Sequence, residues 1–174
     1  MAKISISQTS AFKPCEDGTC DDPKEGAADA IECKQGDKCK GKGCYCQLFQ
    51  REKDAKADDP WDVTPTDGAH EAKKKKEFAY KCICVSPILP AGYTLCDVPL
   101  CKLSDSQDAG GPAEVECTGD CADPCKCILF RLHVKPKKAD KKAAATWEFV
   151  AKKGTKVKRE GGYYYRCFCA KGAG

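Results

Sequence analysis

Sixteen cysteines, arranged as two ordered sets of eight, constrain this chain more than any other feature of its sequence. The numbering offset is 81 from Cys15 to Cys96 and drifts only to 85 from Cys84 to Cys169. A nearly fixed offset along a whole chain indicates internal duplication. The first set is Cys15, Cys20, Cys33, Cys39, Cys44, Cys46, Cys82 and Cys84, and the second is Cys96, Cys101, Cys117, Cys121, Cys125, Cys127, Cys167 and Cys169.

Other residues follow the same offset. The segment CYCQLF at 44–49 matches CKCILF at 125–130, and FAYKCIC at 78–84 matches YYYRCFC at 163–169. The only two tryptophans, Trp61 and Trp147, stand at corresponding places. We therefore expect two tandem homologous units, residues 1–88 and residues 89–174.

The high cysteine content predicts the class of fold. Sixteen cysteines in 174 residues reach the share typical of disulfide scaffolds. A unit of about 85 residues has a marginal apolar core and usually needs covalent or metal cross-links. Disulfides in small domains stabilise by about 2–4 kcal/mol each.

Each unit begins with a Gly- and Pro-interrupted arm, residues 10–43 or 92–124, that carries four cysteines and shows no strand or helix periodicity. Segments rich in β-forming residues follow the arms. We expect a mainly β fold in which each unit is a short antiparallel sheet with an irregular Cys-rich arm. The expected strands are 44–49, 61–64 and 77–85 in the first unit and 125–134, 146–151 and 162–170 in the second.

Two Cys-x-Cys pairs per unit lie on expected strands, where alternation directs both side chains of a pair to one face. In one arrangement the four arm cysteines bond the four strand cysteines; in a variant, facing pairs bond directly. In the alternative arrangement four thiolates hold Zn²⁺, although no Cys-x-x-Cys spacing occurs. We favour disulfides at all sixteen cysteines and no cofactor, with zinc as the alternative.

The predicted disulfides also indicate where the protein is located. Disulfides persist in oxidising compartments, so we expect an extracellular protein or one on a secreted particle. The N-terminal segment lacks the apolar stretch of a secretory signal, so the sequence does not reveal the export route. No apolar run has the length of a membrane span, and no membrane insertion is expected.

The sequence gives little support for a catalytic site. His70 and His133 have no histidine at the matching position of the other unit, and His133 corresponds to Glu52. The acidic pairs at 21–22 and 58–59 stand beside prolines, as turn residues do. We therefore assign no catalytic residue and expect no enzyme.

Lysine runs at 73–76 and 135–142 are the remaining charged feature. Base recognition favours arginine, and only four of the thirty basic residues are arginine. Lysines beside strands also prevent edge-to-edge aggregation. We expect no specific nucleic acid partner.

Tyr164 is the predicted interface residue, because it aligns with Ala79 and the shared core does not require its ring. The sequence as a whole favours a non-catalytic structural or binding protein of an extracellular assembly, whose partners are other proteins or copies of itself. Two alternatives stay open: an intracellular zinc-binding adaptor, and a double-headed protease inhibitor or toxin-like module with an exposed binding loop.

Overall fold

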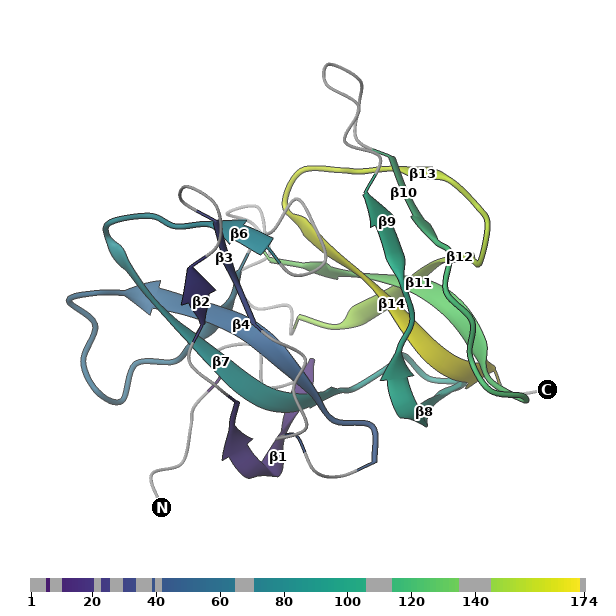
Figure 1. Ribbon diagram of the computed structural model, residues 1–174, viewed down its shortest axis with the longest axis horizontal. Coiled ribbons are helices and arrows are strands. Elements are labelled where there is room, and N and C mark those ends of the chain that lie inside the picture. The colour runs from purple at the N-terminus through teal and green to yellow at the C-terminus, as the bar shows by residue number, and fades with distance from the viewer. Residues whose placement is uncertain are drawn as a thin grey trace.

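The computed structural model describes residues 6, 11–20, 23–25, 30–33, 39, 42–64, 71–105, 114–134 and 145–172. Every regular element in these ranges is a β-strand. Figure 1 shows the first half of the chain, in purple to teal, beside the second half, in green to yellow. The predicted mainly β, antiparallel, disulfide-rich fold is confirmed.

The first half contains a four-stranded and a three-stranded antiparallel sheet (Figure 1). The main sheet has the order β1-β7-β4-β5 and the small sheet the order β2-β3-β6. The strands are β1 (Phe12–Thr19), β2 (Lys24–Glu25), β3 (Ala30–Glu32), β4 (Tyr45–Glu52), β5 (Asp62–Val63), β6 (Glu71–Lys73) and β7 (Phe78–Pro87).

The second half has the same composition of sheets. Its main sheet has the order β12-β11-β14-β8 and its small sheet the order β13-β10-β9. The strands are β8 (Tyr93–Leu100), β9 (Leu103–Asp105), β10 (Glu114–Cys117), β11 (Lys126–His133), β12 (Trp147–Lys152), β13 (Val157–Lys158) and β14 (Tyr163–Gly172). Taken by position in each half, the strands pair in the same order in both, although the duplication itself remains an inference from the sequence.

The arms differ from the prediction of irregular structure. Strand β1 pairs antiparallel with β7, and β8 pairs with β14, so each arm supplies an edge strand to a main sheet. Pro14 and Pro99 lie in these two strands, and proline is compatible with a sheet edge because the outer N–H groups bond no neighbour. The prolines and a register shift in each pairing explain why the sequence shows no clear alternation there.

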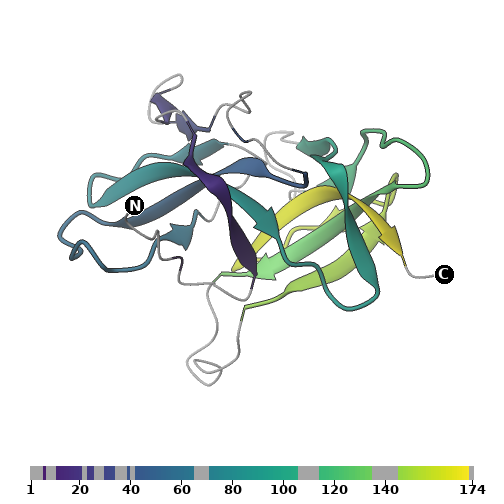
Figure 2. The ribbon, with the colours of Figure 1, turned by 90° about the horizontal axis from the view of Figure 1, so that it is seen from below.

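The largest core lies between the two main sheets. Alternate residues of β4 and β7 pack against alternate residues of β11 and β14, in one cluster that contains both halves. Aromatic rings cross the boundary: Phe12 meets Trp147 edge to face at 5.6 Å, and Tyr45 meets Phe168 at 5.8 Å between centroids. Figure 2 shows the two main sheets lying next to each other. The halves therefore share their main apolar core.

A second contact between the halves lies at the turn before β4. The N–H of Gly43 donates to the carbonyl oxygen of Asp97 at 3.0 Å, and Lys42 forms an exposed ion pair with Asp97. Gly43 has a φ of 77°, and a Cβ there would lie 2.9 Å from the Leu95 side chain. This turn therefore needs glycine for its conformation, and any larger residue would also displace the Leu95 side chain.

The outer face of each main sheet is covered by its own arm. In the first half, Ile31 and Cys33 of the arm pack on Cys46, Leu48 and Cys82. In the second half the corresponding cluster joins arm residues Leu103, Val115 and Cys117 to residues of β11, β12 and β14. The molecule is thus layered as arm, main sheet, main sheet and arm.

Candidate functional site

All sixteen cysteines form disulfides, and each half uses the same pairing order. Counted within a half, the first cysteine pairs with the fifth, the second with the sixth, the third with the seventh and the fourth with the eighth. Arm cysteines therefore bond strand cysteines, as the first of the predicted arrangements requires. The bonds are Cys15–Cys44, Cys20–Cys46, Cys33–Cys82, Cys39–Cys84, Cys96–Cys125, Cys101–Cys127, Cys117–Cys167 and Cys121–Cys169.

Strand register explains how the Cys-x-Cys pairs meet. Strand β4 pairs with β7 so that Cys46 is directly opposite Cys84, and Cys127 is likewise opposite Cys169 on β11 and β14. Since alternate residues share a face, the strand cysteines all point to the outer face, towards the arms. The variant in which facing pairs bond each other does not occur. In this oxidised state no thiolate is left for the four-thiolate zinc sites of the alternative hypothesis.

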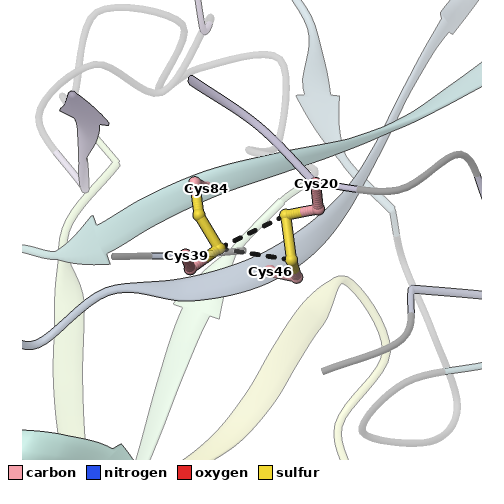
Figure 3. Close-up of side chains that lie close together, drawn as sticks. All are labelled: Cys20, Cys39, Cys46 and Cys84. Carbon is pink, nitrogen blue, oxygen red and sulfur yellow. Dashed lines mark hydrogen bonds between the residues drawn. A yellow bond between two sulfur atoms is a disulfide. The ribbon is translucent and has the colours of Figure 1, made fainter. Parts of the chain in front are cut away.

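Two disulfides of the first half lie in direct contact (Figure 3). The Sγ atom of Cys39 is 3.2 Å from that of Cys46 and 3.4 Å from that of Cys20, which belong to the neighbouring disulfide. All four sulfur atoms of Cys20, Cys39, Cys46 and Cys84 lie within 4.8 Å of one another. Cys46 and Cys84 are buried, whereas Cys20 and Cys39 are partly exposed. We call these four residues the sulfur quartet.

The second half contains no equivalent quartet among its eight cysteines, all of which the structure describes. Its sulfur atoms gather only in threes, as Cys101 with Cys121 and Cys169, and as Cys101 with Cys117 and Cys127. Throughout the described part of the chain, each group of three or more neighbouring metal-ligand side chains consists of cysteines.

A polar network lies inside the shared core. The hydroxyl of Tyr164 donates to Oε1 of Gln47 at 3.0 Å, and Arg166 donates to the Tyr164 oxygen at 3.4 Å. The Arg166 guanidinium also lies 5.2 Å from the centre of the Tyr45 ring. All four side chains are buried. Because buried polar groups need partners, this network fixes how the two sheets are placed against each other.

The prediction of Tyr164 as a surface contact requires correction. Its side chain is 0% exposed and packs in the core between the halves, where its ring lies 6.0 Å from that of Trp147. The comparison with Ala79 treated the two units as separate, whereas their main sheets face each other. Tyr164 therefore joins the two halves and is not available to another protein at the surface.

Burial raises the pKa of Tyr45 well above its ordinary value of 10.0. The Coulombic interaction with Tyr164 acts in the same direction, and the positive charge of Arg166 opposes both. The Tyr45 hydroxyl has no hydrogen-bond partner among the described residues. Tyr45 therefore stays neutral in the folded protein at ordinary pH.

The other candidate residues are not brought together. His133 lies at the end of β11 with its ring 4.8 Å from that of Tyr163, and His70 is outside the described residues. The Asp59 carboxylate accepts a hydrogen bond from the backbone N–H of Lys56, which is a turn contact. Lys74, Lys75 and Lys76 are exposed, and the lysine run at 135–142 lies outside the described ranges, as do the acidic residues at 21–22.

An aromatic surface exists at a place that the sequence prediction missed. Phe149 on β12 is 44% exposed, and its ring stacks on that of Tyr93 at 5.7 Å. When the sequences of the two expected units are aligned, Phe149 corresponds to Val63, which is buried. A large ring in place of a core valine was the available signal. Val98 on β8, 74% exposed, adds a second apolar side chain on an edge strand.

No protein-family model matches the chain, and no match was found among curated proteins or solved structures. Among the described residues, no helix has the length and hydropathy needed to cross a bilayer. The disulfides, the shared core and the exposed surface are the features of this chain that bear on its function.

Proposed function

We propose that this chain is a non-catalytic structural or binding protein of an extracellular assembly. The observation that supports this most is the complete pairing of the cysteines, with four arm-to-strand disulfides in each half. Disulfides of this density persist in oxidising surroundings and stabilise small domains whose cores are marginal. They also make a durable scaffold, which suits a protein with a structural or binding role rather than a catalytic one.

The edge strands of the second main sheet are the proposed contact surface. Edge strands carry backbone N–H and C=O groups that another chain can pair with, and β12 also exposes the ring of Phe149. The opposite edge, β8, is partly occupied because Asp97 accepts the hydrogen bond from Gly43. We therefore assign partner binding to the β12 edge, with another extracellular protein or a second copy of the chain as the partner.

The location is tested by alkylating the thiols of intact producing cells and their medium before lysis, then measuring the chain in each fraction by mass spectrometry. We expect the protein in the extracellular or particle fraction with no cysteine alkylated. A chain found in the cytosolic fraction with alkylated cysteines contradicts the proposal and favours the zinc adaptor.

The contact surface is tested with Phe149→Asp, using cross-linking in the isolated extracellular material and sedimentation of the purified chain. Ile88→Asp is the matched control, because Ile88 is 46% exposed but lies outside the strands. We expect Phe149→Asp to remove the cross-linked species and Ile88→Asp to retain it. Equal cross-linking in both variants would remove the β12 edge from the proposal.

A further inference from the structure

After reduction, the sulfur quartet would have four thiol groups at a spacing close to that of a four-cysteine metal site. Zinc held by four cysteines has Zn–S bonds of about 2.3 Å in a tetrahedron, which places the sulfur atoms about 3.8 Å apart. The four sulfur atoms of Cys20, Cys39, Cys46 and Cys84 already lie within 4.8 Å of one another. Breaking the two sulfur–sulfur bonds therefore needs only small side-chain rotations to surround one cation.

The surroundings of the quartet keep its four cysteines together after reduction. Cys46 and Cys84 are opposite each other on the paired strands β4 and β7, so two ligands are fixed by the main sheet. The arm that carries Cys39 stays attached through Cys33–Cys82, whose two cysteines are 5% and 2% exposed. A site that is held in place before the metal arrives loses little conformational entropy on binding.

Each disulfide of the quartet also has an accessible end. Cys20 and Cys39 are partly exposed, whereas their partners are buried. A reductant in solution can therefore approach each bond from the side of its partly exposed cysteine without unfolding the sheet. By contrast, both cysteines of Cys117–Cys167 in the second half are fully buried.

We propose that reduction of Cys20–Cys46 and Cys39–Cys84 creates a four-thiolate site for one Zn²⁺ ion, so that metal binding by this chain is controlled by its oxidation state. Each disulfide takes two electrons and two protons and gives two thiols. The four thiols then lose four protons as they bind Zn²⁺. The oxidised chain has no such site, because cysteine binds Zn²⁺ as a thiolate and the neutral sulfur atoms of a disulfide are poor ligands.

The test uses the purified full-length chain under native conditions, with a water-soluble phosphine as the reductant and Co²⁺ as the spectroscopic probe. The phosphine supplies the two electrons per disulfide, water supplies the protons, and the oxygen ends on phosphorus. Alkylation and mass spectrometry follow which cysteines are open at each step. We expect the visible absorption of tetrahedral cobalt thiolate, at one Co²⁺ per chain, to appear only when both disulfides of the quartet have opened.

Two paired variants assign the site to the first half. Cys20→Ser with Cys46→Ser removes two ligands, and Cys101→Ser with Cys127→Ser removes the corresponding disulfide of the second half. We expect the first pair to abolish the cobalt absorption and the second pair to retain it. Equal loss in both, or retention in the first, overturns the proposal.

A second readout needs no variant and so does not depend on the variants folding. When Zn²⁺ is added to the reduced wild-type chain, we expect Cys20, Cys39, Cys46 and Cys84 to resist alkylation and to become reactive after a chelator is added. Uniform alkylation of all free cysteines with Zn²⁺ present contradicts the site. Because the purified chain is used, a failure here does not affect the proposed extracellular role.

Discussion

Tyr164 on β14 donates a hydrogen bond to the side-chain oxygen of Gln47 on β4, with 3.0 Å between the two oxygen atoms. This buried contact joins residues 117 positions apart in the sequence, one from each half. It lies in the core that the two main sheets share, beside the guanidinium of Arg166. The hydrogen bond between Tyr164 and Gln47 therefore forms only when the two halves are packed against each other.

We predict that Tyr164→Phe destabilises the folded chain by about 1–3 kcal/mol, because it leaves the buried oxygen of Gln47 without its partner. The measurement is the free energy of unfolding in urea. Tyr163→Phe is the control, since Tyr163 is only partly buried, and little change is expected. A Tyr164→Phe variant as stable as the wild type would show that the contact does not stabilise the packing of the halves.

The corresponding substitution at Tyr45, the other tyrosine beside Arg166 in the shared core, should raise the stability of the folded chain. Because the Tyr45 hydroxyl is buried without a hydrogen-bond partner among the described residues, Tyr45→Phe removes an unfavourable buried hydroxyl. Such groups destabilise by about 1–3 kcal/mol in mutational data, so we expect a variant that unfolds at a higher urea concentration. A lower unfolding midpoint would contradict the hydrogen-bond assignment at Tyr45.

Alkaline pH should lower the stability of the folded wild-type chain more than that of the Tyr45→Phe variant. The raised pKa of Tyr45 means that, above its ordinary value of 10.0, the unfolded chain loses the phenolic proton while the folded chain keeps it. Stability from this group is thus complete below that pH and falls as pH rises, by up to about 1.4 kcal/mol per pH unit. Urea unfolding from pH 9 upwards, at roughly half-unit steps, measures the difference. Identical slopes for the two chains would contradict this prediction.

The shared core predicts that the two halves unfold together. Trp61 is partly buried in the first half, with Arg51 4.3 Å from its ring, and Trp147 is buried against Phe12. Trp61→Phe and Trp147→Phe each leave one fluorescent reporter. We expect the unfolding of each variant, followed by its remaining tryptophan and by circular dichroism, to give coincident transitions. Separate midpoints within one variant would show that the halves are independent domains.

Solvent access predicts the order in which native disulfides are reduced. Cys15 and Cys44 are both partly exposed, whereas Cys117 and Cys167 are both 0% exposed. We expect Cys15–Cys44 to open among the first and Cys117–Cys167 among the last under a mild reductant, followed by alkylation and peptide mapping. The difference should disappear in denaturant. Equal rates in the native state would show that the second-half arm does not shield its disulfide.

The sequence predicted the features that depend on local alternation. The spacing of Cys44 and Cys46, and of Cys82 and Cys84, placed each pair on one face of a strand, and the structure confirms the arm-to-strand bonds. The sequence did not predict the disulfide connectivity, because eight cysteines allow 105 pairings and spacing alone does not select one. The register of β4 on β7 places Cys46, Cys82 and Cys84 on one face of the sheet. The course of the arm over that face then sets which arm cysteine meets each of them.

The features that depend on how the halves pack were not predicted. Tyr164 and Ala79 occupy corresponding places, yet the first is buried against Gln47 and the second is only partly buried. Trp61 and Trp147 also differ, because only Trp147 is fully buried and donates its indole N–H to the Ala11 carbonyl of the other half. The sequence comparison treats each expected unit alone, whereas these differences arise because two facing sheets must be complementary rather than identical.

The most direct test of the account is a peptide map of the native chain, digested and separated without reductant. We predict an intact mass sixteen hydrogen atoms below that of the fully reduced chain, and eight disulfides with the first-to-fifth, second-to-sixth, third-to-seventh and fourth-to-eighth pairing in each half. Free thiols in the native protein, or bonds that join the two halves, would contradict the arm-to-strand architecture and the extracellular role proposed from it.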